Sequence, residues 1–155
     1  MIRQHYSMAG ALIVAGVMLS GPALAADKLC TLAIAGNDLM QFDKKELAVA
    51  TDCTQVKVTL THTGKLAASA MGHDWVLVRT EDVTPVANAG AAAGLSNNYL
   101  QPGDKRVIAA TKVIGGGQST SVTFPASALQ KGQSYTYFCT FPGHNALMKG
   151  TLTFG

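Results

Sequence analysis

The stretch Gln55-Val56-Lys57-Val58-Thr59-Leu60-Thr61-His62 decides the fold class of this chain. Its side chains alternate, so that Val56, Val58, Leu60 and His62 fall on one face and polar residues on the other. A period of two is typical of a β-strand with one buried face. The chain is therefore expected to build at least one sheet that covers a core.

Other short segments of strand-like composition occur along the rest of the chain, and clusters of turn residues separate them. The predicted strands are 29–35, 40–42, 47–49, 75–78, 106–109, 111–114, 119–124, 133–139 and 147–154. About eight short strands with frequent turns predict an all-β domain, a Greek-key sandwich of two sheets. Residues 81–97 are rich in Ala and Gly and predict a small helical flap outside the sheets, and 126–129 predict one helical turn.

The N-terminus has the layout of a secretory signal peptide. Arg3 is followed by an apolar run over 8–19 and by the small-residue site Ala23-Leu24-Ala25. We expect residues 1–25 to be removed, which leaves one exported domain, 26–155, with no membrane span. The alternative is a retained membrane anchor, but the run is shorter than the roughly 20 residues that a span needs.

The charge excludes one class of function. The chain has 155 residues, a formal net charge of +3 and no run of Lys and Arg. A nucleic-acid-binding surface usually shows a basic stripe, so no nucleic-acid partner is expected.

The chain has three cysteines, an odd number for an oxidising compartment. A bridge between Cys30 and Cys53 leaves Cys139 free to bind a metal. Pairings through Cys139 remain the alternative, and they would occupy that thiol.

Four metal-ligating side chains come from two segments. Cys139, His144 and Met148 lie in the stretch 137–150, and His73 precedes the strand over 75–78. Two imidazoles, one thiolate and a weak thioether are the ligand set of a blue-copper electron-transfer site. Pro142-Gly143 turns the chain, so one end of the sandwich would hold all four.

Two other readings of these residues stay open. Zinc prefers a fourth strong ligand, and Asp74 beside His73 is available for that role. A Cys and a His also form nucleophilic pairs in enzymes. No third orienting residue is evident near Cys139, however, and we expect no enzyme.

Several motifs resemble those of the azurins, a family of bacterial cupredoxins. The matching segments, in the same order, are Cys30, 36–42, Cys53, 71–77, 106–109, 121–124, 139–144 and 146–153. The resemblance extends over 26–155 and implies the cupredoxin fold with one bound copper ion. It also implies the disulfide Cys30–Cys53.

The resemblance implies a role for each site residue. His73, Cys139 and His144 would be the strong copper ligands, Met148 the weak axial ligand, and the Gly72 carbonyl would approach from the opposite side. His62 would be a buried histidine near the site, or simply a satisfied core residue. Around the edge of His144 an apolar docking patch would comprise Met40, Met71, Phe141, Pro142, Ala146 and Leu147.

One residue departs from the family pattern. Azurins usually carry Asn where this chain has Asp74, and that Asn fixes the ligand loop by hydrogen bonds. Asp74 and Phe141 are the two residues expected directly behind the ligands. A carboxylate accepts the same N–H bonds but lacks the amide donor. An ionised Asp74 would favour oxidised copper and lower the reduction potential.

The leading functional hypothesis is a monomeric periplasmic carrier of single electrons. The resemblance implies redox partners such as c-type cytochromes and nitrite reductase. The alternative is a periplasmic copper-storage or copper-delivery protein, although the four His and six Met are scattered rather than clustered. A partner-binding role for the sandwich itself is a third class.

Overall fold

The computed structural model describes residue 1 and residues 27–155. The expected signal peptide and its cleavage site therefore lie almost wholly outside the described residues. Among the described residues, no helix has the length and apolar character needed to cross a membrane.

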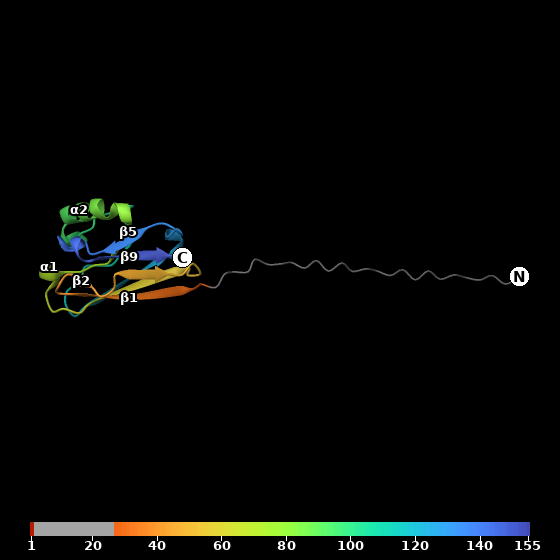
Figure 1. The fold of residues 1–155 in the computed structure, drawn as a ribbon, viewed down its shortest axis with the longest axis horizontal. Helices are drawn as coiled ribbons and strands as arrows, with labels where there is room; N and C mark the ends of the chain where they lie inside the picture. The colour runs from red at the N-terminus through yellow and green to blue at the C-terminus, as the bar shows by residue number, and fades with distance from the viewer. Residues whose placement is uncertain (2–26) are drawn as a thin grey trace.

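Nine strands in the described part of the chain form two sheets that stack as layers, which confirms the two-sheet sandwich (Figure 1). One sheet has the order β2-β1-β4-β7, made of Gln41–Phe42, Leu29–Asn37, Gln55–His62 and Ser119–Pro125. The other has the order β3-β9-β8-β5-β6, made of Glu46–Val49, Lys149–Phe154, Tyr135–Phe138, Val76–Arg79 and Ala109–Ala110. Strands β1 and β4 run parallel, as do β3 and β9.

The main core lies between the two sheets. All four inward residues of β4 are 0% exposed, as the alternation predicts. Trp75 and Leu77 from the β5 segment and Tyr137 from β8 pack against them from the other sheet. Cys139 belongs to the same core cluster, so its thiol points between the sheets.

A second, smaller core explains the flap. Helix α2, Val83–Ala93, lies outside the sheet that contains β5 and β9 (Figure 1). Its Val86 and Ala87 pack with Phe138 on the outer face of that sheet. Gly90 lies within the helix, and an added Cβ would lie 2.0 Å from the Tyr99 carbonyl oxygen, so only glycine permits this close approach.

Some predicted elements were wrong in detail. Residues 111–114 form no strand; Ile114 makes only an isolated bridge with His73. The strand expected over 106–109 is reduced to β6. A four-residue helix, α1 (Ala68–Met71), and short 3₁₀ turns at Thr80–Asp82, Leu95–Asn97, Ala126–Ala128 and His144–Ala146 complete the elements.

The topology brings the ends of several strands to one end of the sandwich. The ends of β1, β4 and β8 and the beginnings of β5 and β9 meet there, near α1 and opposite the C-terminus (Figure 1). The four candidate ligands all lie at these strand ends.

Candidate metal centre

Three buried side chains converge at this end of the sandwich. One ligand atom each from His73, Cys139 and His144 lies within 4.8 Å of the other two. His73 and Cys139 are 0% exposed and His144 is 3% exposed. Within the part of the chain that the structure describes, this is the one cluster of its kind.

The sulfur of Cys139 is the centre of the cluster. Its Sγ lies 3.5 Å from His144 Nδ1 and 3.9 Å from His73 Nδ1. The carbonyl oxygen of Gly72 lies 3.8 Å from the same sulfur. The structure thus brings together the two imidazoles and the thiol that the sequence singles out, and with them the carbonyl that the family resemblance implies.

The hydrogen bonds of His73 fix its ring. Its Nε2 lies 2.8 Å from the carbonyl oxygen of Asn37, which can only accept, so Nε2 carries the proton. Nδ1, with its lone pair, therefore faces the sulfur of Cys139. Burial lowers the pKa of His73, which keeps the imidazole neutral and able to bind a metal.

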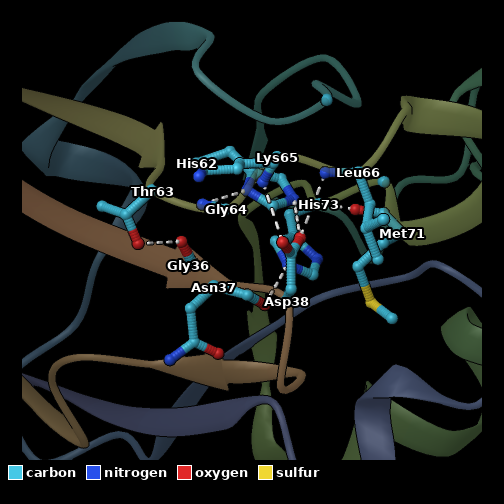
Figure 2. A network of polar contacts seen from close by, with 12 residues as sticks. Gly36, Asn37, Asp38, His62, Thr63, Gly64, Lys65, Leu66, Met71 and His73 are labelled. Carbon is cyan, nitrogen blue, oxygen red and sulfur yellow. Dashed lines mark hydrogen bonds and ion pairs between the residues drawn. The ribbon is translucent and has the colours of Figure 1, made fainter.

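The ring of His62 packs against the ring of His73. The two rings are stacked, with centroids 4.2 Å apart and an angle of 14° between the planes. His62 Nε2 donates to the Met71 carbonyl at 2.8 Å, and Nδ1 accepts from the Gly64 N–H at 3.0 Å (Figure 2). Both ring nitrogens are used, so His62 is a satisfied core residue that holds the ligand ring in place.

His144 lies on a 3₁₀ turn just after the loop Pro142-Gly143. The Leu147 and Met148 N–H groups both donate to its carbonyl, at 3.0 and 2.7 Å. Burial, together with the nearby imidazoles of His73 and His62, lowers its pKa to about 4. The ring is therefore neutral at neutral pH.

Met148 is fixed by the same backbone network. Its carbonyl accepts from the Cys139 N–H at 3.0 Å, and its side chain is 0% exposed. A Cβ added to Gly36 would lie 2.7 Å from the Met148 methyl carbon and 2.8 Å from His73 Cδ2. Gly36 lies in β1, one residue beyond the strand expected over 29–35, and its lack of a side chain leaves room for two of the candidate ligands.

Asp74 does not join the cluster. Its Oδ1 accepts from the Thr140 N–H at 2.7 Å and its Oδ2 accepts from the Thr140 hydroxyl. Burial raises the pKa of Asp74 to about 6. With both carboxylate oxygens engaged, Asp74 leaves the site without the fourth strong ligand that zinc prefers.

The thiol of Cys139 is strongly desolvated. Burial raises its pKa well above the usual value, and the Asp74 carboxylate adds to the rise. The backbone N–H groups of Asp74 and Phe141 act in the opposite sense, because they favour the thiolate. Only a bound cation would make the thiolate the stable form in such a place.

The members of the expected docking patch lie in the turn after β1 (Met40), at the end of α1 (Met71) and in the loop over 141–147. Pro142 and Ala146 are exposed and Leu147 is 61% exposed, whereas the other three members are half-buried. The Phe141 ring lies against His144, with centroids 4.5 Å apart. Tyr99, which sequence reasoning missed, packs edge-on against Phe141 at 5.2 Å.

The other two cysteines are paired. Cys30 and Cys53 form a disulfide with a Cα–Cα distance of 5.7 Å, and Cys139 is free and buried. The expected pairing is therefore confirmed. Cys30 lies near the beginning of β1, at the end of the sandwich away from the cluster.

The donor set fits copper. A thiolate and a thioether are soft ligands, and imidazole suits copper in both of its common oxidation states. The His, Cys, His and Met side chains, all buried at one strand-end cluster, match the ligand arrangement of a type 1 copper site.

Comparison with known proteins agrees with this chemistry. The family described as copper binding proteins, plastocyanin/azurin family, matches residues 28–155. Azurin of Bordetella pertussis is 57% identical over 133 residues, which are 86% of this chain and 87% of that protein. Azurin of Pseudomonas aeruginosa strain PAO1 is 52% identical over 136 residues, 88% of this chain and 90% of that protein.

A solved structure gives the same result for the fold. The azurin Az-iso2 of Methylomonas sp. strain J superposes with a TM-score of 0.79 at 45% identity, covering 81% of this chain and 98% of that one. The chain therefore belongs to the plastocyanin/azurin family of copper-binding proteins.

Proposed function

We propose that His73 Nδ1, Cys139 Sγ and His144 Nδ1 are the strong ligands of one type 1 copper ion. Met148 would supply a weak ligand through its thioether, and the Gly72 carbonyl would be a further oxygen near the metal. The observation that carries this proposal is the buried convergence of two Nδ1 atoms and one Sγ within 4.8 Å. The protein is a blue-copper electron carrier.

The copper supplies a one-electron couple, and the chain supplies its surroundings. His73 is held by its bond to Asn37 and by the stacked ring of His62. Cys139 and Met148 are tied to each other through a backbone hydrogen bond. Ligands held this firmly move little when the charge of the metal changes, so electrons exchange quickly.

The burial of the ligands favours electron transfer over catalysis. The three strong ligands and Met148 are between 0 and 3% exposed. A catalytic metal keeps a coordination position open for water or substrate, and ligands this deeply buried favour a closed site instead. Electrons therefore enter and leave through a ligand edge, and the protein is not an enzyme.

The docking patch is the surface through which electrons would pass between the copper site and a redox partner. Weak redox encounters use small interfaces, which suits an apolar surface of a few side chains around His144. The partners are periplasmic redox proteins such as c-type cytochromes and nitrite reductase. The protein acts as a monomer of residues 26–155 after residues 1–25 are removed on export to the periplasm.

A stopped-flow experiment tests the carrier role. A reduced c-type cytochrome mixed with the oxidised copper protein should be oxidised as the copper absorption bleaches, by a second-order reaction. Leu147→Lys should slow this reaction at least several-fold. Leu29→Lys is the matched control, because Leu29 is 53% exposed at the opposite end and should not matter.

The alternative of copper storage or delivery predicts different behaviour. A delivery protein hands its metal on, so copper would pass quickly to a strong chelator. The buried ligands favour slow release instead. Rapid copper loss combined with no electron exchange with the cytochrome would replace the carrier role by the delivery role.

A further inference from the structure

The loop over 141–148 carries two of the four proposed ligands and is held mainly by its own backbone, as in the bonds to the His144 carbonyl. Of the described residues outside 139–148, only Lys45 has a side chain that hydrogen-bonds to this loop. Its Nζ donates to the carbonyl oxygen of Leu147 at 3.1 Å. The contact joins positions 102 residues apart in the sequence.

Lys45 is itself fixed to the strands that flank the loop. Its carbonyl accepts from the Thr151 N–H of β9 at 2.9 Å. The carbonyl of Lys44 accepts from the Tyr137 hydroxyl of β8 at 2.8 Å. A Cβ on Gly150 would lie 2.5 Å from the Lys45 carbonyl and 2.2 Å from the Tyr137 hydroxyl, so this close packing depends on a glycine.

The bonded carbonyl belongs to the peptide group that joins Leu147 to Met148. The Leu147 side chain is 61% exposed and gives this peptide little packing support. Hydrogen bonds from a charged donor are stronger than neutral ones. The same peptide also has backbone bonds, since the Leu147 carbonyl accepts from the Lys149 N–H at 3.2 Å and the Met148 N–H donates to the His144 carbonyl at 2.7 Å. Among the described residues outside 139–148, the ammonium of Lys45 is therefore the one side-chain restraint on the backbone that carries the thioether.

We propose that Lys45 is a positioning residue for the axial thioether of Met148, an inference that rests on the proposed copper function. Its ammonium holds the 147–148 peptide against β8 and β9, and so sets how closely the thioether approaches the metal. The axial interaction is the weak one in such a site and tunes its redox properties. A restraint at this peptide acts on that interaction more than on Cys139, whose position follows from β8.

The test compares Lys45→Met with Lys149→Met. Lys149 is exposed and lies next to Met148, and no hydrogen bond or ion pair of its ammonium occurs within the described part of the chain. Both variants lose one positive charge near the metal, but only Lys45→Met loses the hydrogen bond to the Leu147 carbonyl. The charge effect on the reduction potential should be similar in the two variants and should shrink at high salt.

Three results are expected for Lys45→Met alone. The copper hyperfine splitting in the EPR spectrum and the relative intensities of the thiolate-to-copper bands change. Copper affinity falls about tenfold, the lower end of the loss seen when outer contacts of a metal ligand are removed, and copper passes to a chelator correspondingly faster. Part of the shift in potential persists at high salt. Lys45→Arg, which keeps the charged donor, should restore all three.

If Lys45→Met and Lys149→Met give the same spectra, the same rate of copper release and the same reduction potential at high salt, the hydrogen bond from Lys45 to Leu147 has no positioning role. A copper-free measurement separates this inference from the proposed function. Hydrogen exchange of the Met148 N–H in the apo protein should be several-fold faster in Lys45→Met than in Lys149→Met. Equal exchange rates overturn the inference, whereas a parent protein that binds no copper overturns the proposed function.

Discussion

The carboxylate of Asp74 accepts two hydrogen bonds from Thr140, one from the backbone N–H at 2.7 Å and one from the hydroxyl. Asp74 follows His73, and Thr140 follows Cys139. The pair therefore joins the two segments that bring separate ligands to the metal. It does so with a buried carboxylate where azurins usually have an uncharged amide.

Replacing Asp74 by Asn should raise the reduction potential of the copper protein. The amide keeps an acceptor for the Thr140 N–H but carries no negative charge to favour the oxidised metal. Coulomb interactions between charges this close, at an effective dielectric of about 20, put the effect on the order of 3 kcal/mol. Voltammetry of the two proteins checks it, with Asp43→Asn as an exposed-carboxylate control; no change, or a lower potential, would contradict the explanation.

The same substitution should change the pH dependence of the apo protein's stability. Burial raises the folded-state pKa of Asp74 from 3.8 to about 6. Its contribution to stability is therefore complete below about pH 4 and is lost as the pH rises through 6. The free energy of unfolding of Asp74→Asn, relative to the parent, should increase from pH 4 to pH 7, by an amount on the order of 2 kcal/mol.

Urea unfolding of both apo proteins across this pH range measures that difference. Burial lowers the pKa of His73 and His144, so these groups act in the opposite sense and cost stability as the pH falls. They are common to both proteins and cancel in the comparison. A difference between parent and variant that is constant with pH would show that Asp74 does not titrate as described.

Gly36→Ala should disturb the copper site through steric contact alone. The added methyl group would lie 2.7 Å from the Met148 methyl carbon and 2.8 Å from His73 Cδ2. Overpacking of this kind costs about 1–3 kcal/mol, and here two ligands must move. The visible and EPR spectra should change, whereas those of Ala33→Ser, on the exposed face of the same strand, should not. Unchanged spectra in Gly36→Ala would show that the site accommodates the added methyl group without displacing the ligands.

The disulfide should stabilise the fold without affecting the metal. Replacing both Cys30 and Cys53 by Ala opens a loop with a sequence separation of 23 and should lower the free energy of unfolding by about 3 kcal/mol. The copper spectrum should be unchanged, because the bridge lies at the far end of the sandwich. Thermal unfolding and absorption spectra of the double variant test both parts, and a shifted spectrum would link the two ends.

Local sequence patterns carry much of this structure. Alternation correctly places Val56, Val58 and Leu60 in the core, because a strand with one buried face leaves a clear period of two. The ligand types of Cys139 and His144 point to copper because their softness is a property of the residues themselves. These predictions need no knowledge of tertiary contacts.

The remaining features depend on contacts between distant segments. Lys45 and Leu147 meet only because β3 and β9 lie side by side, and the space at Gly36 arises only when β1 packs near His73. Residues 111–114 have strand-like composition, yet only Ile114 forms a β-bridge, with His73, while Thr111 contacts Trp75 through one backbone bond and one side-chain bond. The sequence pattern within each of these segments does not predict contacts with distant segments.

The optical spectrum of the copper-loaded protein tests the central claim most directly. Oxidised parent protein should show the intense blue absorption of a thiolate bound to copper. Cys139→Ser should lose that absorption, while a variant without the Cys30–Cys53 bridge should keep it. A colourless copper-loaded parent, or a blue Cys139→Ser protein, would contradict the assignment of Cys139 as the thiolate ligand of a type 1 copper ion.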